Sequence, residues 1–135
     1  MSGVYARNRK ETFFEPVDNA ASLQDAVTQY VMNERRVPKK WRFVIGIDLI
    51  RKTDEIMDLA ISANETWMGE ATIEKRRDLW RECFKACKQL DRKLSRLINC
   101  VPSATPTSMK EILELLDKEI RVVANCRDNE KARKG

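Results

Sequence analysis

The stretch of residues 70–100 reads EATIEKRRDLWRECFKACKQLDRKLSRLINC, and it contains neither proline nor any glycine. Its apolar side chains recur every three or four positions, which is the period of one face of an α-helix. These positions are Trp80, Cys83, Phe84, Cys87, Leu90, Leu94, Leu97 and Ile98. The stretch therefore predicts a long amphipathic helix with one buried face.

Three further helices are predicted on either side of this stretch, over residues 18–34, 41–65 and 108–126. Pro38 ends the first of them, because the residue before a proline is pushed out of the α region. Gly69 lies in the turn before the long helix, and Pro102 and Pro106 lie in the loop after it. The sequence SMKE of residues 108–111 is a capping-box pattern, which predicts the start of the last helix.

Four helices with short connections predict an all-α fold, an antiparallel up-and-down four-helix bundle. A chain of 135 residues is long enough to form one domain with its own core. We expect three parts: a flexible basic N-terminal arm over residues 1–17, the bundle over residues 18–126, and a basic C-terminal tail over residues 127–135. No apolar run approaches the ~18 residues of a membrane span, so no membrane partner is expected.

The helix predicted over residues 41–65 carries two apolar stripes on roughly opposite faces. The first has the spacing of a coiled-coil seam and consists of Phe43, Ile47, Ile50, Asp54, Met57 and Ile61. The second consists of Ile45, Leu49, Ile56 and Ala60. A helix of a monomeric bundle needs only one such stripe. We therefore expect the second stripe to contact another subunit in a homo-oligomer, although a fully central helix would also have two apolar faces.

Ionisable and sulfur-containing residues argue against an enzyme. The chain has no histidine, so it lacks the commonest general base and the commonest metal ligand. Cys83 and Cys87 lie one helical turn apart, but a tetrahedral metal site would need further ligands, so we interpret them as small core residues. We expect no cofactor, no metal and no catalytic residue. Four cysteines within helical patterns indicate free thiols and a cytoplasmic location. Asp54 in the first stripe is expected either to set the register of the helices or to pair with a cation such as Arg76.

Lysine and arginine residues are concentrated in two groups along the chain. The first follows one face of the long helix, opposite its apolar face, and consists of Arg77, Arg81, Lys85, Lys88, Arg92 and Arg96. The second surrounds Pro38 and consists of Arg35, Arg36, Lys39, Lys40 and Arg42. A line of cations along a helix suits a phosphate backbone better than a small ligand, and the rings of Trp41 and Phe43 beside the second group could stack on bases. The alternative is a solvated charged surface, with both rings in the core.

Several of these segments resemble one small family of four-helix-bundle proteins. The resemblance rests on VPKKWRF at residues 37–43, on the two-striped helix that ends at Ala63 and Asn64, and on RRD at residues 76–78, and it covers residues 18–126. The family includes the accessory variability (Avd-like) proteins of diversity-generating retroelements and the proteins encoded by intervening sequences of bacterial 23S ribosomal RNA genes. The resemblance implies a barrel-shaped homopentamer with a basic surface. In the retroelement branch, it implies binding to a reverse transcriptase and to RNA.

Taken together, the sequence predicts a non-enzymatic nucleic-acid-binding accessory protein, with a reverse transcriptase, RNA or an RNA–DNA hybrid, and further copies of itself as partners. Two alternatives remain. The basic surface could dock an acidic protein in an interaction scaffold that does not bind RNA, or the chain could belong to the ribosomal branch and have no reverse transcriptase partner.

Overall fold

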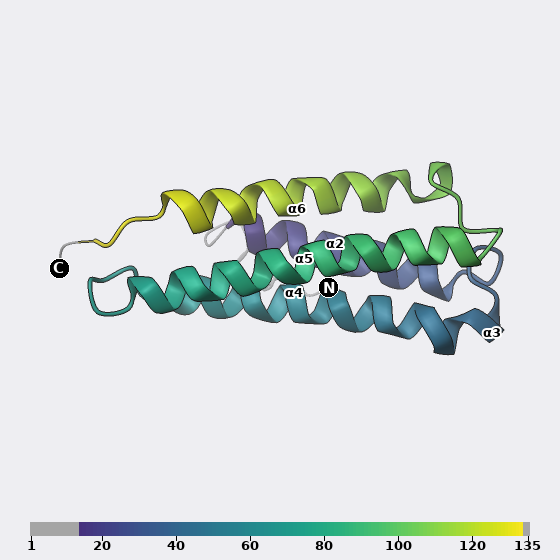
Figure 1. Ribbon diagram of the computed structural model, residues 1–135, viewed down its shortest axis with the longest axis horizontal. Coiled ribbons are helices and arrows are strands. Elements are labelled where there is room, and N and C mark those ends of the chain that lie inside the picture. The colour runs from purple at the N-terminus through teal and green to yellow at the C-terminus, as the bar shows by residue number, and fades with distance from the viewer. Residues whose placement is uncertain (1–13, 134–135) are drawn as a thin grey trace, which may run out of the picture.

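The computed structural model describes residues 14–133, and every helix in that range is shown in Figure 1. The long helices are α2 (Glu15–Met32), α4 (Ile47–Glu65), α5 (Ile73–Cys100) and α6 (Lys110–Asn129). Three short elements precede α4 or α6, namely α3 (Lys39–Trp41), the π-helix η1 (Arg42–Gly46) and the 3-10 helix η2 (Thr107–Met109). The all-α prediction is confirmed. The predicted arm lies outside the described residues up to position 13, and residues 15–17 belong to α2.

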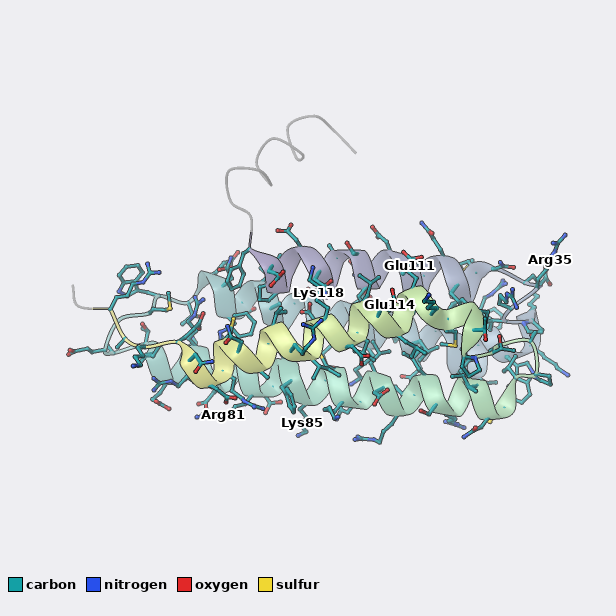
Figure 2. All side chains as sticks on the ribbon, turned by 90° about the horizontal axis from the view of Figure 1, so that it is seen from above. Arg35, Arg81, Lys85, Glu111, Glu114 and Lys118 are labelled. Atoms are coloured by element: carbon teal, nitrogen blue, oxygen red, sulfur yellow. The ribbon has the colours of Figure 1, made fainter. Side chains whose placement is uncertain are left out.

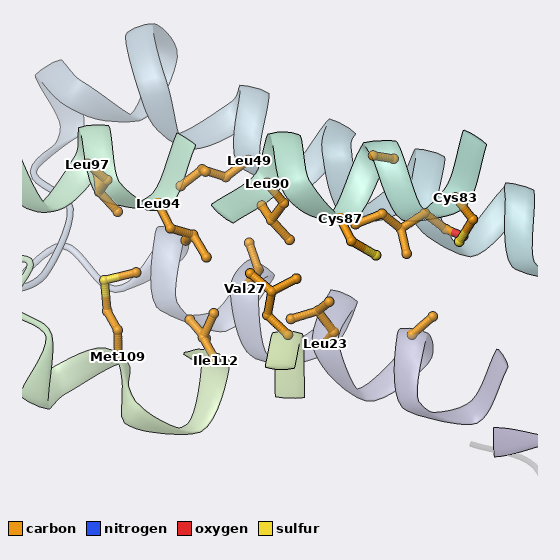
Figure 3. Packing of buried hydrophobic residues seen from close by; sticks show 14 of the residues in the cluster. Leu23, Val27, Leu49, Cys83, Cys87, Leu90, Leu94, Leu97, Met109 and Ile112 are labelled. Atoms are coloured by element: carbon orange, nitrogen blue, oxygen red, sulfur yellow. The ribbon is translucent and has the colours of Figure 1, made fainter. Parts of the chain in front are cut away.

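The core lies among the four long helices, where α2 packs on α4 and α6, and α5 packs on the same two helices. Leu23 and Val27 of α2 meet Leu90 and Leu94 of α5 at its centre (Figure 3). Cys83, Cys87 and Cys126 are buried as expected, whereas Cys100 is exposed. None of the helices described here is both long and apolar enough to cross a membrane.

The stripe of α4 that was predicted to contact another subunit is the one that faces the core. Ile45, Leu49, Ile56 and Ala60 are at most 4% exposed within the single chain, so the predicted subunit contact is wrong for these residues. The other stripe is half-buried, and Phe43 at its start is 69% exposed. The reason is packing: α4 packs on both α2 and α5, so this stripe, together with Thr53 and Ala63, faces the core.

Asp54 and Arg76 do not pair with each other. Asp54 is exposed and accepts a hydrogen bond of 2.6 Å from the side-chain amide of Gln24 on α2. Arg76 is 4% exposed and forms a bidentate ion pair with Glu130, with N···O distances of 2.6 and 2.8 Å. The indole of Trp80 donates a third hydrogen bond to the same carboxylate, at 2.7 Å.

The guanidinium of Arg76 also holds the end of α4. Its Nη1 atom lies 2.9–3.1 Å from three backbone carbonyl oxygens, those of Ala63, Asn64 and Thr66. The last carbonyls of a helix have no partner within the helix, and here one side chain satisfies them. Arg76 therefore connects the start of α5 to the end of α4 and to the segment after α6.

A second buried polar group connects α2 and α6. Glu119 is 0% exposed, and its Oε1 atom accepts a hydrogen bond of 2.9 Å from the side-chain amide of Asn19. That amide also donates to the carbonyl of Leu115 at 2.9 Å. The Oε2 atom of Glu119 is buried without a hydrogen-bond partner among the described residues. Burial raises the pKa of Glu119 to about 8. The hydrogen bond from Asn19 acts to lower this pKa, and the negative charge of Glu15 acts to raise it.

The start of α6 differs from the predicted capping box. Ser108 and Thr105 cap each other instead: the amide of Ser108 donates to Oγ1 of Thr105 at 3.2 Å, and the amide of Thr105 donates to Oγ of Ser108 at 3.1 Å. Lys110 begins the α-helix only after the turn of η2. The capping pair is therefore one turn earlier than the sequence SMKE suggests.

Gly46, at the end of η1, allows α4 to approach α2. A Cβ atom built at this position would lie 2.7 Å from Cγ1 of Val31, whose side chain is fully buried and β-branched. Replacing Gly46 with alanine adds helix propensity of up to about 1 kcal/mol but overpacks the core by about 1–3 kcal/mol.

We therefore expect the Gly46→Ala variant to be less stable than the wild type by about 1 kcal/mol in urea denaturation. Ser95→Ala, at an exposed position of α5, is the matched control and adds only helix propensity. A Gly46→Ala variant that is as stable as the control would show that α2 and α4 can move apart without a loss of folding free energy.

Candidate nucleic-acid interface

We name the predicted cations of α5 the α5 band: Arg77, Arg81, Lys85, Lys88, Arg92 and Arg96. All of them lie on the outer surface of the helix, and only Arg77 is half-buried. Figure 2 shows Arg81 and Lys85 at the outer edge of α5, directed away from the core. The predicted separation of the basic and apolar faces of this helix is therefore confirmed.

The first turns of the α5 band are neutralised by neighbouring acidic groups. Arg77 forms an ion pair with Glu74 and donates to the backbone carbonyl of Glu130 at 3.0 Å. Arg81 forms an ion pair with Asp78. These two arginines are part of a local network, so they attract a polyanion less than their formal charge suggests.

The rest of the α5 band is unpaired. Lys85, Lys88, Arg92 and Arg96 are exposed, and none of them forms an ion pair within residues 14–133. Four cations with no acidic partner over about three helical turns form the strongest candidate for phosphate contact on this helix.

We name the second predicted group the turn cluster: Arg35, Arg36, Lys39, Lys40 and Arg42. Four of its members are exposed, and Arg36 donates to the carbonyl of Ser103 at 3.4 Å. Arg42 is different because it is half-buried and donates to the carbonyls of Val31 and Met32, at 3.3 and 3.4 Å. Arg42 therefore caps the end of α2 and is not a free cation.

The two predicted rings behave differently. Trp41 is half-buried against the core, with the ammonium of Lys40 5.9 Å from its ring centroid. Phe43 is 69% exposed and Val44 is 60% exposed, on the π-helix that leads into α4. Of the two rings, Phe43 is the one available for stacking.

The structure brings the end of the α5 band close to the start of α4. Lys93 of α5 forms an ion pair of 2.5 Å with Asp48 of α4, and Lys52 of α4 donates to the side chain of Gln89 on α5 at 2.7 Å. Between these helices lies an open groove of about 360 Å³, which we name the α4–α5 groove. It is lined by Lys52, Gln89, Arg92, Lys93 and Arg96.

Lys52, Gln89 and Lys93 were not among the predicted site residues. Lys93 lies away from the α5 band on a helical wheel, and Lys52 belongs to a different helix. Asp48 and Lys93, forty-five residues apart, pair across neighbouring turns of α4 and α5. Complementary charges on the two helices were the only signal for it in the sequence.

The buried thiols have the properties of core groups. The pKa of Cys87 is raised above its ordinary range by a hydrogen bond with Cys83 and by burial. Burial raises the pKa of Cys126 to about 12. A thiol with a raised pKa remains protonated and is a poor nucleophile or metal ligand. Among the described residues, no group of three or more Cys, Asp or Glu side chains is arranged to hold a metal ion.

Comparisons of the chain with protein-family models, with curated proteins and with solved structures found no match.

Proposed function

We propose that this protein is a non-enzymatic nucleic-acid-binding accessory protein whose basic surface binds RNA. One observation supports the proposal most: Lys85, Lys88, Arg92 and Arg96 form a row of exposed, unpaired cations beside the groove. A surface that served only for solubility would be expected to interleave acidic partners, as the first turns of α5 do.

The mechanism is electrostatic. Each cation that contacts a phosphate displaces a condensed counterion, so affinity falls steeply as salt concentration rises. Arg35, Arg36, Lys39 and Lys40 add a second group of exposed cations at the turn after α2. Phe43 adds an exposed ring on which a base could stack. Arg77, Arg81 and Arg42 play a smaller part because they are held by internal partners.

The proposed biological role is based on the resemblance to the accessory variability family. We propose an antiparallel four-helix bundle that works in the cytoplasm with a reverse transcriptase and its template RNA. A homopentamer would multiply weak contacts with RNA. The subunit contact would then involve the half-buried residues Ile47, Ile50, Met57 and Ile61 of the other stripe, since the stripe first predicted for it is inside the core.

Charge reversal tests the proposal. We expect the variant Lys85→Glu, Lys88→Glu, Arg92→Glu and Arg96→Glu to bind a 20-nucleotide single-stranded RNA about 100-fold or more weakly than the wild type, in fluorescence anisotropy at 50 mM salt. The cause is the loss of up to four phosphate contacts and the repulsion from four new carboxylates.

The control variant reverses Lys75, Lys110, Arg121 and Lys131, which are exposed elsewhere on the described surface and give the same net charge. We expect it to lose less than 10-fold, because only long-range attraction changes. Equal losses in the two variants would contradict a defined binding surface. Weak RNA binding by the wild type, together with tight binding to an acidic protein, would favour the interaction scaffold.

A further inference from the structure

We propose that the α4–α5 groove is a discrete site for phosphate groups, which holds the backbone of a single RNA strand without reading its bases. This inference rests on the proposed function for its biological ligand. Its chemical basis is the set of side chains that line the groove: Lys52, Gln89, Arg92, Lys93 and Arg96.

The charges in the groove are not balanced. The Asp48 carboxylate lies 2.5 Å from the ammonium of Lys93, and the Glu55 carboxylate lies 2.6 Å from that of Lys52. Lys93 of α5 is thereby joined to α4, and Lys52 of α4 also donates to Gln89 of α5, so both lysines bridge the two helices. Arg92 and Arg96 have no ion-pair partner among the described residues and are exposed. The groove therefore has two cations in excess, which matches two phosphodiesters or one phosphate with two charges.

The two free arginines repel each other. They are four residues apart on α5, where side chains are neighbours on the helix surface and like charges are destabilising. An anion between them would remove this repulsion. Guanidinium groups also bind phosphate oxygens in a bidentate manner, which fits the geometry of a phosphodiester.

Gln89 adds a neutral donor to the wall of the groove. Its Oε1 atom accepts the hydrogen bond from Lys52 at 2.7 Å, which leaves the side-chain NH₂ group to donate to a ligand. None of the lining residues is aromatic, so a base has no ring to stack on inside the groove. The groove is therefore suited to phosphate and is expected to show no preference among bases.

The groove volume, about 360 Å³, is at the lower end of the range for ligand sites, about 300–1,000 Å³. Ligand sites of this size usually have mostly apolar walls. This one is lined by four cationic side chains and an amide, which excludes an apolar ligand and requires an anionic one.

Tripolyphosphate and a 20-nucleotide oligouridylate are the two probes for this inference. The groove variant is Arg92→Gln with Arg96→Gln, and the matched control is Lys75→Gln with Arg121→Gln, which removes two exposed cations that lie outside both the groove and the α5 band. We expect the groove variant to bind tripolyphosphate at least about 10-fold more weakly in titration calorimetry, and the control to change less than about 3-fold. For the oligouridylate, the slope of log affinity against log salt should fall by about 1.4, from two contacts at about 0.7 each.

The outcomes distinguish a failure of the groove inference from a failure of the proposed RNA-binding function. Equal losses of tripolyphosphate affinity in the two variants would overturn the groove as a discrete site, and RNA binding by the α5 band would then be tested by the charge-reversal variant alone. Tripolyphosphate binding that depends on Arg92 and Arg96, without any oligouridylate binding, would support a phosphate site and contradict the RNA-binding function. Unchanged tripolyphosphate affinity in the groove variant overturns the inference in either case. Circular dichroism checks that these exposed substitutions leave the fold unchanged.

Discussion

Replacing Arg76 with alanine is expected to lower the free energy of unfolding by about 3–5 kcal/mol. The substitution leaves the Glu130 carboxylate, whose side chain is 14% exposed, without its cationic partner. It also removes the guanidinium donor from the carbonyls of Ala63, Asn64 and Thr66, of which the Ala63 carbonyl keeps a hydrogen bond from the amide of Thr66. Because a buried charge and several backbone acceptors lose their partner together, this is the largest loss expected from one substitution.

Urea denaturation followed by circular dichroism measures this effect. Lys75→Ala is the matched control, since Lys75 precedes Arg76 in the chain but is exposed, and we expect a change within about 0.5 kcal/mol. Arg76→Lys keeps the charge but loses the planar fork, so an intermediate loss is expected. A loss below 1 kcal/mol for Arg76→Ala would mean that water replaces the guanidinium, and that the contacts of Arg76 do not hold the end of α4.

Replacing Glu119 with glutamine is expected to remove a strong pH dependence of stability. In the unfolded chain this carboxyl has its ordinary pKa of 4.5, whereas burial raises the pKa to about 8 in the folded protein. The folded state therefore binds more protons between these two values, and stability falls as pH rises through this window. The stability is fully present below pH 4.5 and is lost by about pH 8. The total is on the order of 5 kcal/mol, because each pKa unit corresponds to about 1.4 kcal/mol.

Glutamine cannot ionise, and its side-chain oxygen can still accept the hydrogen bond from Asn19. We expect the Glu119→Gln variant to match the wild type near pH 4.5 and to be more stable by several kcal/mol at pH 8–9. Glu114→Gln removes an exposed carboxyl of the same helix and should keep the pH profile of the wild type. Parallel profiles for Glu119→Gln and the wild type between pH 5 and 9 would show that the Glu119 carboxyl ionises normally in the folded state.

Local rules were sufficient to predict the helices. Pro38 and the pair Pro102 and Pro106 mark helix ends, and the apolar period of residues 70–100 identifies the buried face of α5. The basic face of that helix followed from the same period. Such features depend on neighbouring residues along one helix, and they needed no knowledge of which helices meet.

The choice between the two stripes of α4 could not be made from size and hydrophobicity, since the bulkier stripe proved to be the outer one. Asp54 was the available signal, because a carboxyl without a nearby cation is costly in a core. Glu119 is the opposite case. Its spacing from Leu116 and Val123 fits the buried face of α6, although glutamate side chains are almost never fully buried without a partner. Glu119 lies in the core as a neutral acid, because burial raises its pKa to about 8.

Ion pairs between residues far apart in the chain are harder to predict from a sequence. The ion pair of Arg76 with Glu130 joins residues that are fifty-four positions apart, and the pair of Asp48 with Lys93 joins residues forty-five positions apart. The second pair lies between the two helices that border the α4–α5 groove. One sequence offers many such charge pairs, so this part of the site required the three-dimensional arrangement.

RNA affinity across a salt series is the most direct test of the central claim, on protein whose mass in solution has been checked. For a 20-nucleotide single-stranded RNA, four unpaired cations predict a slope of log affinity against log salt of about −3 or steeper. Reversal of Lys85, Lys88, Arg92 and Arg96 should remove most of this slope. Negligible binding at low salt, or an affinity that does not change with salt, would contradict phosphate contact by the α5 band.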